Sequence, residues 1–113
     1  MKNYQKIIGL LGVDYEVVMP DEQQYMQSVK ALLTGQDFIR LGHCIQGKQW
    51  HLVMNNSAKL KKHCEELGIT CFDAYLKALR DTARRQNHSE ALQIMSRITV
   101  KRVQLRNLFA EEN

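Results

Sequence analysis

The chain has a single proline, Pro20, and only six glycines among its 113 residues. Because proline breaks helices and glycine weakens them, this shortage allows long helices over almost the whole length. Aromatic residues make up only 7% of the chain, whereas hydrophobic residues make up 44%. This balance is typical of aliphatic helix packing rather than of a β-sandwich. We therefore expect a single all-α domain that spans residues 1–113.

Disulfides and membrane spans are also not expected. The three cysteines are odd in number and lack CxxC spacing, which argues against a disulfide framework. No apolar run approaches the ~20 residues of a membrane-spanning helix. The N-terminal stretch MKNYQKIIGLLGVDYE has a short apolar centre with two glycines, and acidic residues follow it without a cleavage site. We interpret this stretch as part of the fold, and we expect a cytoplasmic protein without a membrane partner.

Positive charge is concentrated in the second half of the chain. The formal net charge is +4, and residues 1–50 contain as many acidic as basic residues, so the whole excess lies in residues 51–113. Such an excess can meet phosphate, an acidic protein surface or only water.

Capping signals set the ends of several expected helices. Pro20 and Asp21 suit the start of a helix, because proline fits the first turn and a carboxylate favours the positive end of the helix dipole. Gly68 suits a left-handed C-terminal cap, and Ser89 is expected to cap a last helix that begins at Glu90. The expected helices cover about residues 3–11, 21–46 with a bend at Gly35–Gln36, 49–67, 71–86, and 90 onward.

Apolar residues recur at helical spacing and predict how these segments pack. Arg102 falls in the seam of the last segment, where we expect its stem to lie along the core and its head to reach solvent. The fold predicted from these seams is an up-down four-helix bundle with a short additional N-terminal helix. The third segment has a stripe at Val53, Ser57, Leu60, Cys64 and Leu67. The other seams comprise Phe72, Leu76, Leu79 and Ala83, and then Ala91, Ile94, Met95, Ile98, Leu105 and Phe109.

A second face of the third segment is polar except at its centre. Ala58 points away from the core stripe, and at steps of four and three it shares its face with four polar or charged residues. We expect this face to be exposed. These neighbours are His51, Asn55, Lys62 and Glu65.

Five short segments, all different, lie in a characteristic order and spacing along the chain. They are GVDYE at residues 12–16, DEQQY at 21–25, GKQW with SAKLK at 47–50 and 57–61, LG at 67–68, and LRDTARRQNHSEAL at 79–92. In this order and spacing they resemble the histidine phosphotransfer (Hpt) domain family of bacterial phosphorelays. SAKLK corresponds without a gap to the family pattern A-H-x-L-K. The resemblance covers nearly the whole chain and implies a helical bundle of two-component signal transduction.

The chain departs from this family at the reactive position. In the gapless register, the phosphoacceptor histidine of the family falls on Ala58, which has no nucleophile. The family also prefers glycine or serine where this chain has Lys62, whereas Lys61 matches the family's lysine. The resemblance therefore implies a pseudo-Hpt module, neither an enzyme nor a cofactor binder. It would dock a response-regulator receiver domain or a histidine kinase as a monomer. The implied docking face comprises His51, Asn55, Ala58, Lys61, Lys62 and Glu65.

Two further interpretations use histidines. His51 or His63 would make the chain an active phosphorelay carrier if either accepted phosphate, although neither lies at the centre of the Ala58 face. The second, a zinc site, is not predicted, because Cys64 belongs to the core stripe, buried free cysteine is common, and adjacent His–Cys pairs project in different directions on a helix. Its ligands would be His43–Cys44 and His63–Cys64 together with Cys71 or His88.

A nucleic-acid-binding bundle is the third alternative. The basic residues that it would use point in different directions, because Arg97 and Lys101 share one face of the last helix while Arg102 and Arg106 point elsewhere. A solvated surface explains them better than a helix that reads bases, so nucleic acid is not the expected partner. The full basic set is Arg84, Arg85, Arg97, Lys101, Arg102 and Arg106.

Overall fold

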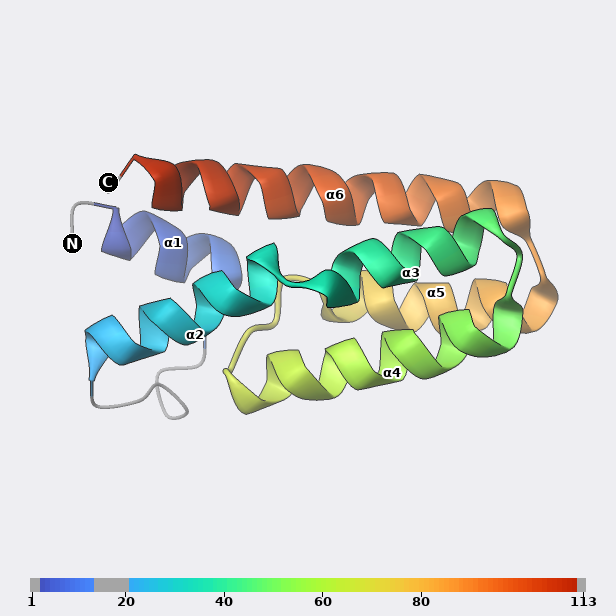
Figure 1. The fold of residues 1–113 in the computed structure, drawn as a ribbon, viewed down its shortest axis with the longest axis horizontal. Coiled ribbons are helices and arrows are strands. Elements are labelled where there is room, and N and C mark those ends of the chain that lie inside the picture. The colour runs from blue at the N-terminus through green and yellow to red at the C-terminus, as the bar shows by residue number, and fades with distance from the viewer. Residues whose placement is uncertain (1–2, 14–20, 112–113) are drawn as a thin grey trace.

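A computed structural model describes residues 3–13 and 21–111 of the chain (Figure 1). Helices account for 83% of the described residues, and none of these residues forms a strand, which confirms the expected all-α class. Pro20 and part of the GVDYE segment lie outside the described residues. The helices are α1 (Tyr4–Leu11), α2 (Glu22–Thr34), α3 (Gln36–Gln46), α4 (Trp50–Glu66), α5 (Asp73–Arg85) and α6 (His88–Ala110).

Helix α6 extends along one long side of the molecule, whose dimensions are 42 × 26 × 19 Å (Figure 1). Helices α1 and α2 pack against its C-terminal part, and α3 and α5 pack against the rest. Helix α4 packs against α3 and α5 and lies on the side of the bundle opposite α6. It therefore turns one face to the core and leaves much of its circumference accessible.

The core stripe predicted for α4 is confirmed. All five of its residues are buried, and the inward residues predicted for α5 are buried with them. On α6 the seam is also buried, except that Met95 is half-buried. The seven residues predicted for a single core belong to one buried cluster: Val53, Leu60, Cys64, Leu67, Leu76, Leu79 and Ile98.

The helix ends follow the predicted capping chemistry with one correction. Asp21 caps α2, because its Oδ1 accepts a hydrogen bond from the Gln24 N–H at 3.1 Å. Gly68 has φ +69°, the left-handed conformation that glycine adopts most readily. The predicted cap at Ser89 is wrong: Asn87 caps α6, its Oδ1 accepting from the Glu90 N–H at 3.1 Å. Since α6 begins at His88, Ser89 lies inside its first turn.

The predicted bend between α2 and α3 lies at Gly35. A Cβ atom at this position would lie 2.9 Å from the Ala31 carbonyl oxygen, so the close backbone approach requires glycine. Arg102 lies beside the break and corrects the expectation for its head group. Its Nε donates to the Leu33 carbonyl at 2.6 Å, and its guanidinium carbon lies 5.4 Å from the centre of the Phe38 ring. Burial lowers the pKa of Arg102, with a smaller contribution from Arg106.

Candidate functional site

The polar face of α4 lies where the helical periodicity puts it. Four of its residues, namely His51, Asn55, Lys62 and Glu65, are exposed. Ala58 and Lys61 are half-buried, so the centre of the face is less open than the sequence suggests. At this centre the face presents the methyl group of Ala58, and the charged side chains of Lys61 and Lys62 follow one turn further along the helix.

Two contacts along the helix order this face. The Asn55 Nδ2 lies 3.3 Å from the His51 Nε2. The Lys61 Nζ donates to the Glu65 Oε1 at 2.6 Å, and this hydrogen bond is the main reason that the pKa of Lys61 is raised. Within the described residues Lys62 makes no ion pair. Thus Lys61 is held along the helix by Glu65, whereas the exposed Lys62 is in no ion pair among the described residues.

Helix α5 contributes charged groups beside Lys61 that the sequence did not identify. Asp73 and Arg80 both act electrostatically on Lys61 across the α4–α5 contact. Burial raises the pKa of the Asp73 carboxyl, while Lys61 opposes this shift. The Oδ1 atom of Asp73 and the Nε atom of Arg80 are buried without a hydrogen-bond partner within the described residues. Lys61 and Glu65 therefore border α5 and its charges.

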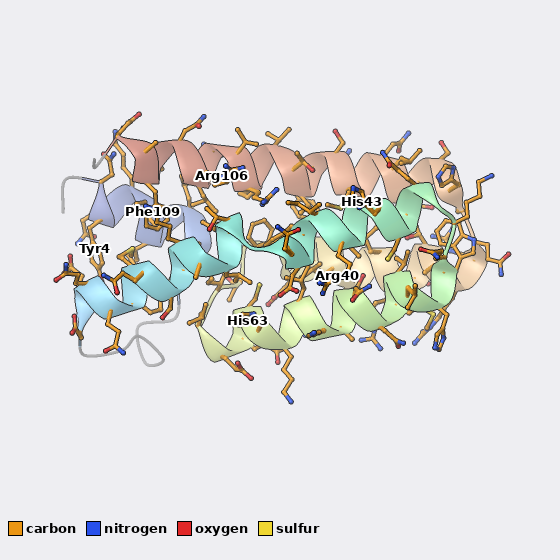
Figure 2. The ribbon with its side chains drawn as sticks, in the orientation of Figure 1. Tyr4, Arg40, His43, His63, Arg106 and Phe109 are labelled. Atoms are coloured by element: carbon orange, nitrogen blue, oxygen red, sulfur yellow. The ribbon has the colours of Figure 1, made fainter. Side chains whose placement is uncertain are left out.

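No nucleophile is present at the centre of the face, and neither nearby histidine lies there. His63 faces α3, where its Nδ1 is 3.9 Å from the Asp37 Oδ2 (Figure 2). His51 lies two turns before Ala58, roughly 10 Å along the helix axis. The arrangement presents polar and charged groups at the surface, but a phosphoryl group at the centre of the face would find no acceptor atom.

The cysteines and histidines considered as zinc ligands do not come together as one site, although Cys64 and Cys71 are near enough to interact electrostatically. Cys44 and Cys64 are buried, and burial raises the pKa of both Cys64 and Cys71 to about 12. His88 packs against Trp50, with ring centres 6.1 Å apart. Across residues 3–13 and 21–111, no group of three or more His, Cys, Asp or Glu side chains could hold a metal ion. These positions therefore give no geometry on which to base a metal centre.

The basic residues do not form one patch. Arg85 binds Asp81 and Glu90, each at 3.0 Å. Arg102 is engaged at the α2–α3 break, as described above. The rest belong to α5 and α6, and they make no ion pair within the part of the chain that the structure describes. They are Arg84, Arg97, Lys101 and Arg106.

A groove between α3 and α6 is a second feature that the sequence did not predict. Its volume is about 320 Å³, and its lining includes Ile39, Gly42, Leu92 and Met95. A clue was available, since Ile39 and Leu92 are aliphatic residues outside the core. Locating the groove still required knowing that α3 packs against α6.

No protein-family model matches this chain, and neither the curated proteins nor the solved structures provide a match. Among the described helices, none combines the length and the apolar character needed to cross a membrane. The sequence motifs and the geometry of the α4 face are therefore the features that bear on function.

Proposed function

We propose that this chain is a pseudo-Hpt module of a two-component phosphorelay, and that it docks a receiver domain or a histidine kinase without accepting phosphate. The observation that carries the proposal is Ala58, half-buried at the centre of the polar face of α4 in the register of the Hpt motif. We further propose that α2 with α3, α4, α5 and α6 correspond to the up-down bundle of that family. Such a module acts as a cytoplasmic monomer.

The chemistry at Ala58 explains why phosphate is not accepted. Phosphoryl transfer needs a nucleophile in line with the leaving oxygen, and an imidazole supplies one near neutral pH. A methyl group cannot replace it. Docking depends instead on surface shape and on charged groups such as Lys61 and Lys62, which the substitution leaves in place. The module would thus occupy a partner's surface and compete with active phosphotransfer domains.

Restoring the histidine tests this proposal. We expect Ala58→His to fold normally and to accept phosphate from a phosphorylated receiver, while the native protein accepts none. Lys62 lies one turn further on the same face, so Ala58→His with Lys62→Gly should accept phosphate faster than Ala58→His alone. The measurement is phosphate that is lost in acid but stable in alkali, followed over time with a panel of receivers. The native protein should bind the receiver that reacts with the variant.

The matched control is Ala58→His with Lys59→Gly. It has the same loss of charge and the same mid-helix glycine, which costs about 1 kcal/mol, but Lys59 points about 100° away from Ala58. It should not be faster than Ala58→His alone. Equal rates for the Lys62 and Lys59 variants would mean that Lys62 is no obstacle. If no variant reacts and the native protein binds no receiver or kinase, the proposed function is wrong.

The displaced-histidine alternative predicts a different result from the same experiment. Acid-labile phosphate on the native protein, mapped to His51 or His63, would make the chain an active carrier. His63→Gln should abolish such labelling if His63, which has a carboxylate neighbour in Asp37, is the acceptor, and His51→Gln should abolish it if His51 is.

A further inference from the structure

Helix α6 has exposed aliphatic residues on the side that faces away from the core. Leu92, Val100 and Val103 are 40%, 67% and 42% exposed. Together with the exposed Ser96 and Thr99 they form what we term the α6 outer stripe. A surface helix ordinarily presents charged and polar residues on its outer side, whereas this stripe contains no charged residue. An uncharged outer face of this kind is typical of a helix that packs against something further.

The stripe continues into the groove between α3 and α6. Leu92, Ser96 and Thr99 line this groove from α6, and Ile39, which is 39% exposed, lines it from α3. Gly42 lies under the Met95 side chain, since a Cβ atom at this position would be 3.8 Å from the Met95 Cε. The only charged or titratable residues in the lining are His43 and Arg102; His43 lies where α3 borders α6 (Figure 2).

Cations flank the stripe on both sides, and acidic residues are missing. Between Ala91 and Ala110 the sequence contains four basic residues and no Asp or Glu. Helical geometry puts Arg97 and Lys101 on one flank and Arg102 and Arg106 on the other. Within the described residues none of the four is in an ion pair. The surface is thus an uncharged seam between two positive edges.

We propose that the α6 outer stripe and the α3–α6 groove bind an amphipathic helix of another protein, with an apolar seam flanked by Glu or Asp. Apolar side chains of such a helix would cover the exposed aliphatic residues, and its carboxylates would meet the positive edges. The main part of this docking surface, the α6 outer stripe, lies on the side of the bundle opposite α4, and the groove shares no residue with the proposed pseudo-Hpt face, so the two surfaces are distinct.

Charge complementarity selects this occupant over two others. A second copy of this chain, docked through the same stripe, would bring positive edges against positive edges. Nucleic acid would favour cations at the centre of the surface, where Val100 and Val103 stand instead. An acid-flanked helix satisfies both the seam and its edges.

Synthetic peptides test the proposal with the full chain. One amphipathic helical peptide carries a Leu and Ala seam flanked by Glu, and its counterpart carries Lys at the flanking positions. We expect fluorescence anisotropy to show that the Glu peptide binds at least about tenfold more tightly than the Lys peptide, and less tightly at high salt. Arg97→Glu with Arg106→Glu should reverse this preference. Lys77→Glu with Arg84→Glu, the same charge change on two exposed residues of α5, should leave this preference unchanged.

The apolar seam is tested by Val103→Glu, which should weaken binding of the Glu peptide at least about tenfold by introducing an unpaired carboxylate. Leu52→Glu is the matched control, because Leu52 on α4 is also 42% exposed. It should change the affinity less than about twofold. Val100→Glu serves as a second seam variant if circular dichroism shows that Val103→Glu disturbs the helix.

Four results would overturn the proposal. The first two are no binding of the Glu peptide and equal binding of both peptides. The third is a dimer in sedimentation equilibrium that Val103→Glu dissociates, since the occupant would then be a second copy. The fourth is duplex DNA that binds more tightly than the Glu peptide and whose binding is insensitive to Val103→Glu.

Discussion

Ala58 places a single methyl group at the centre of the polar face of α4, at the position that our proposal aligns with the reactive histidine of the Hpt motif. Ala58 is half-buried, with Lys61 one turn further along and the charges of α5 beside that lysine. Residue periodicity was sufficient to predict that Ala58 lies off the core stripe. It could not predict that Asp73 and Arg80 of α5 lie near Lys61, because this depends on which residues of α4 and α5 pack side by side.

Ser57 and Leu60 are neighbours on the core stripe of α4. Replacing each with alanine should change the free energy of unfolding in opposite directions. Ser57 is 0% exposed, and its Oγ has no hydrogen-bond partner within the described residues. We expect Ser57→Ala to raise the free energy of unfolding by roughly 0.5–1 kcal/mol, because it removes an unpaired buried hydroxyl. Leu60→Ala should lower it by about 2–4 kcal/mol through a cavity. Urea unfolding measures both, and a loss of stability in Ser57→Ala would indicate a partner for the hydroxyl.

At the scale of whole helices, local signals predicted much of the structure. The stripes of α4 and α5, the bend at Gly35 and the left-handed Gly68 follow from spacing and backbone preference. The predicted start of α6 at Glu90 was wrong, because Asn87 and Ser89 both suit a cap and the sequence alone does not rank them. The groove between α3 and α6 arises from contacts between segments distant in the chain, which periodicity within one helix cannot reveal.

The break between α2 and α3 depends on such a distant contact. Arg102 Nε donates to the Leu33 carbonyl, 69 residues away in the chain. Arg102→Met keeps a long apolar stem but removes the donor, so we expect it to lower the free energy of unfolding by about 1–3 kcal/mol. Arg106→Met, an exposed position one turn further on, should change it by less than about 0.5 kcal/mol. Equal effects in urea unfolding would show that the bond to Leu33 does not stabilise the break.

For the molecule as a whole, the two proposed surfaces lie on opposite sides of one bundle. Helix α4 bears the pseudo-Hpt face, and α6 bears the outer stripe (Figure 1). A rigid core between them would let the chain bind two proteins at once, so that a signalling protein held on α4 is brought near an acidic partner on α6. The two proposals can fail separately, because the Ala58 and Val103 variants change different faces.

Buried thiols make the stability of the whole fold sensitive to alkali. Burial raises the pKa of Cys64 and of Cys71 from an ordinary value of 9.0 to about 12. The native state therefore keeps thiol protons that the unfolded chain releases, so their contribution is complete below pH 9 and is lost as the pH rises toward 12. Tyr25, whose pKa burial also raises to about 12, acts in the same direction.

We expect the free energy of unfolding, measured with urea at a series of pH values, to fall steadily above pH 9, where unfolded thiols begin to ionise. Cys64→Ala with Cys71→Ala lacks both thiols. It should be less stable at neutral pH because it leaves cavities, yet its stability should fall less steeply with pH. The slope does not vanish, because Tyr25 remains. Parallel slopes for the native protein and the double variant would mean that the two thiols titrate alike in the folded and unfolded states, and that burial does not protect their protons.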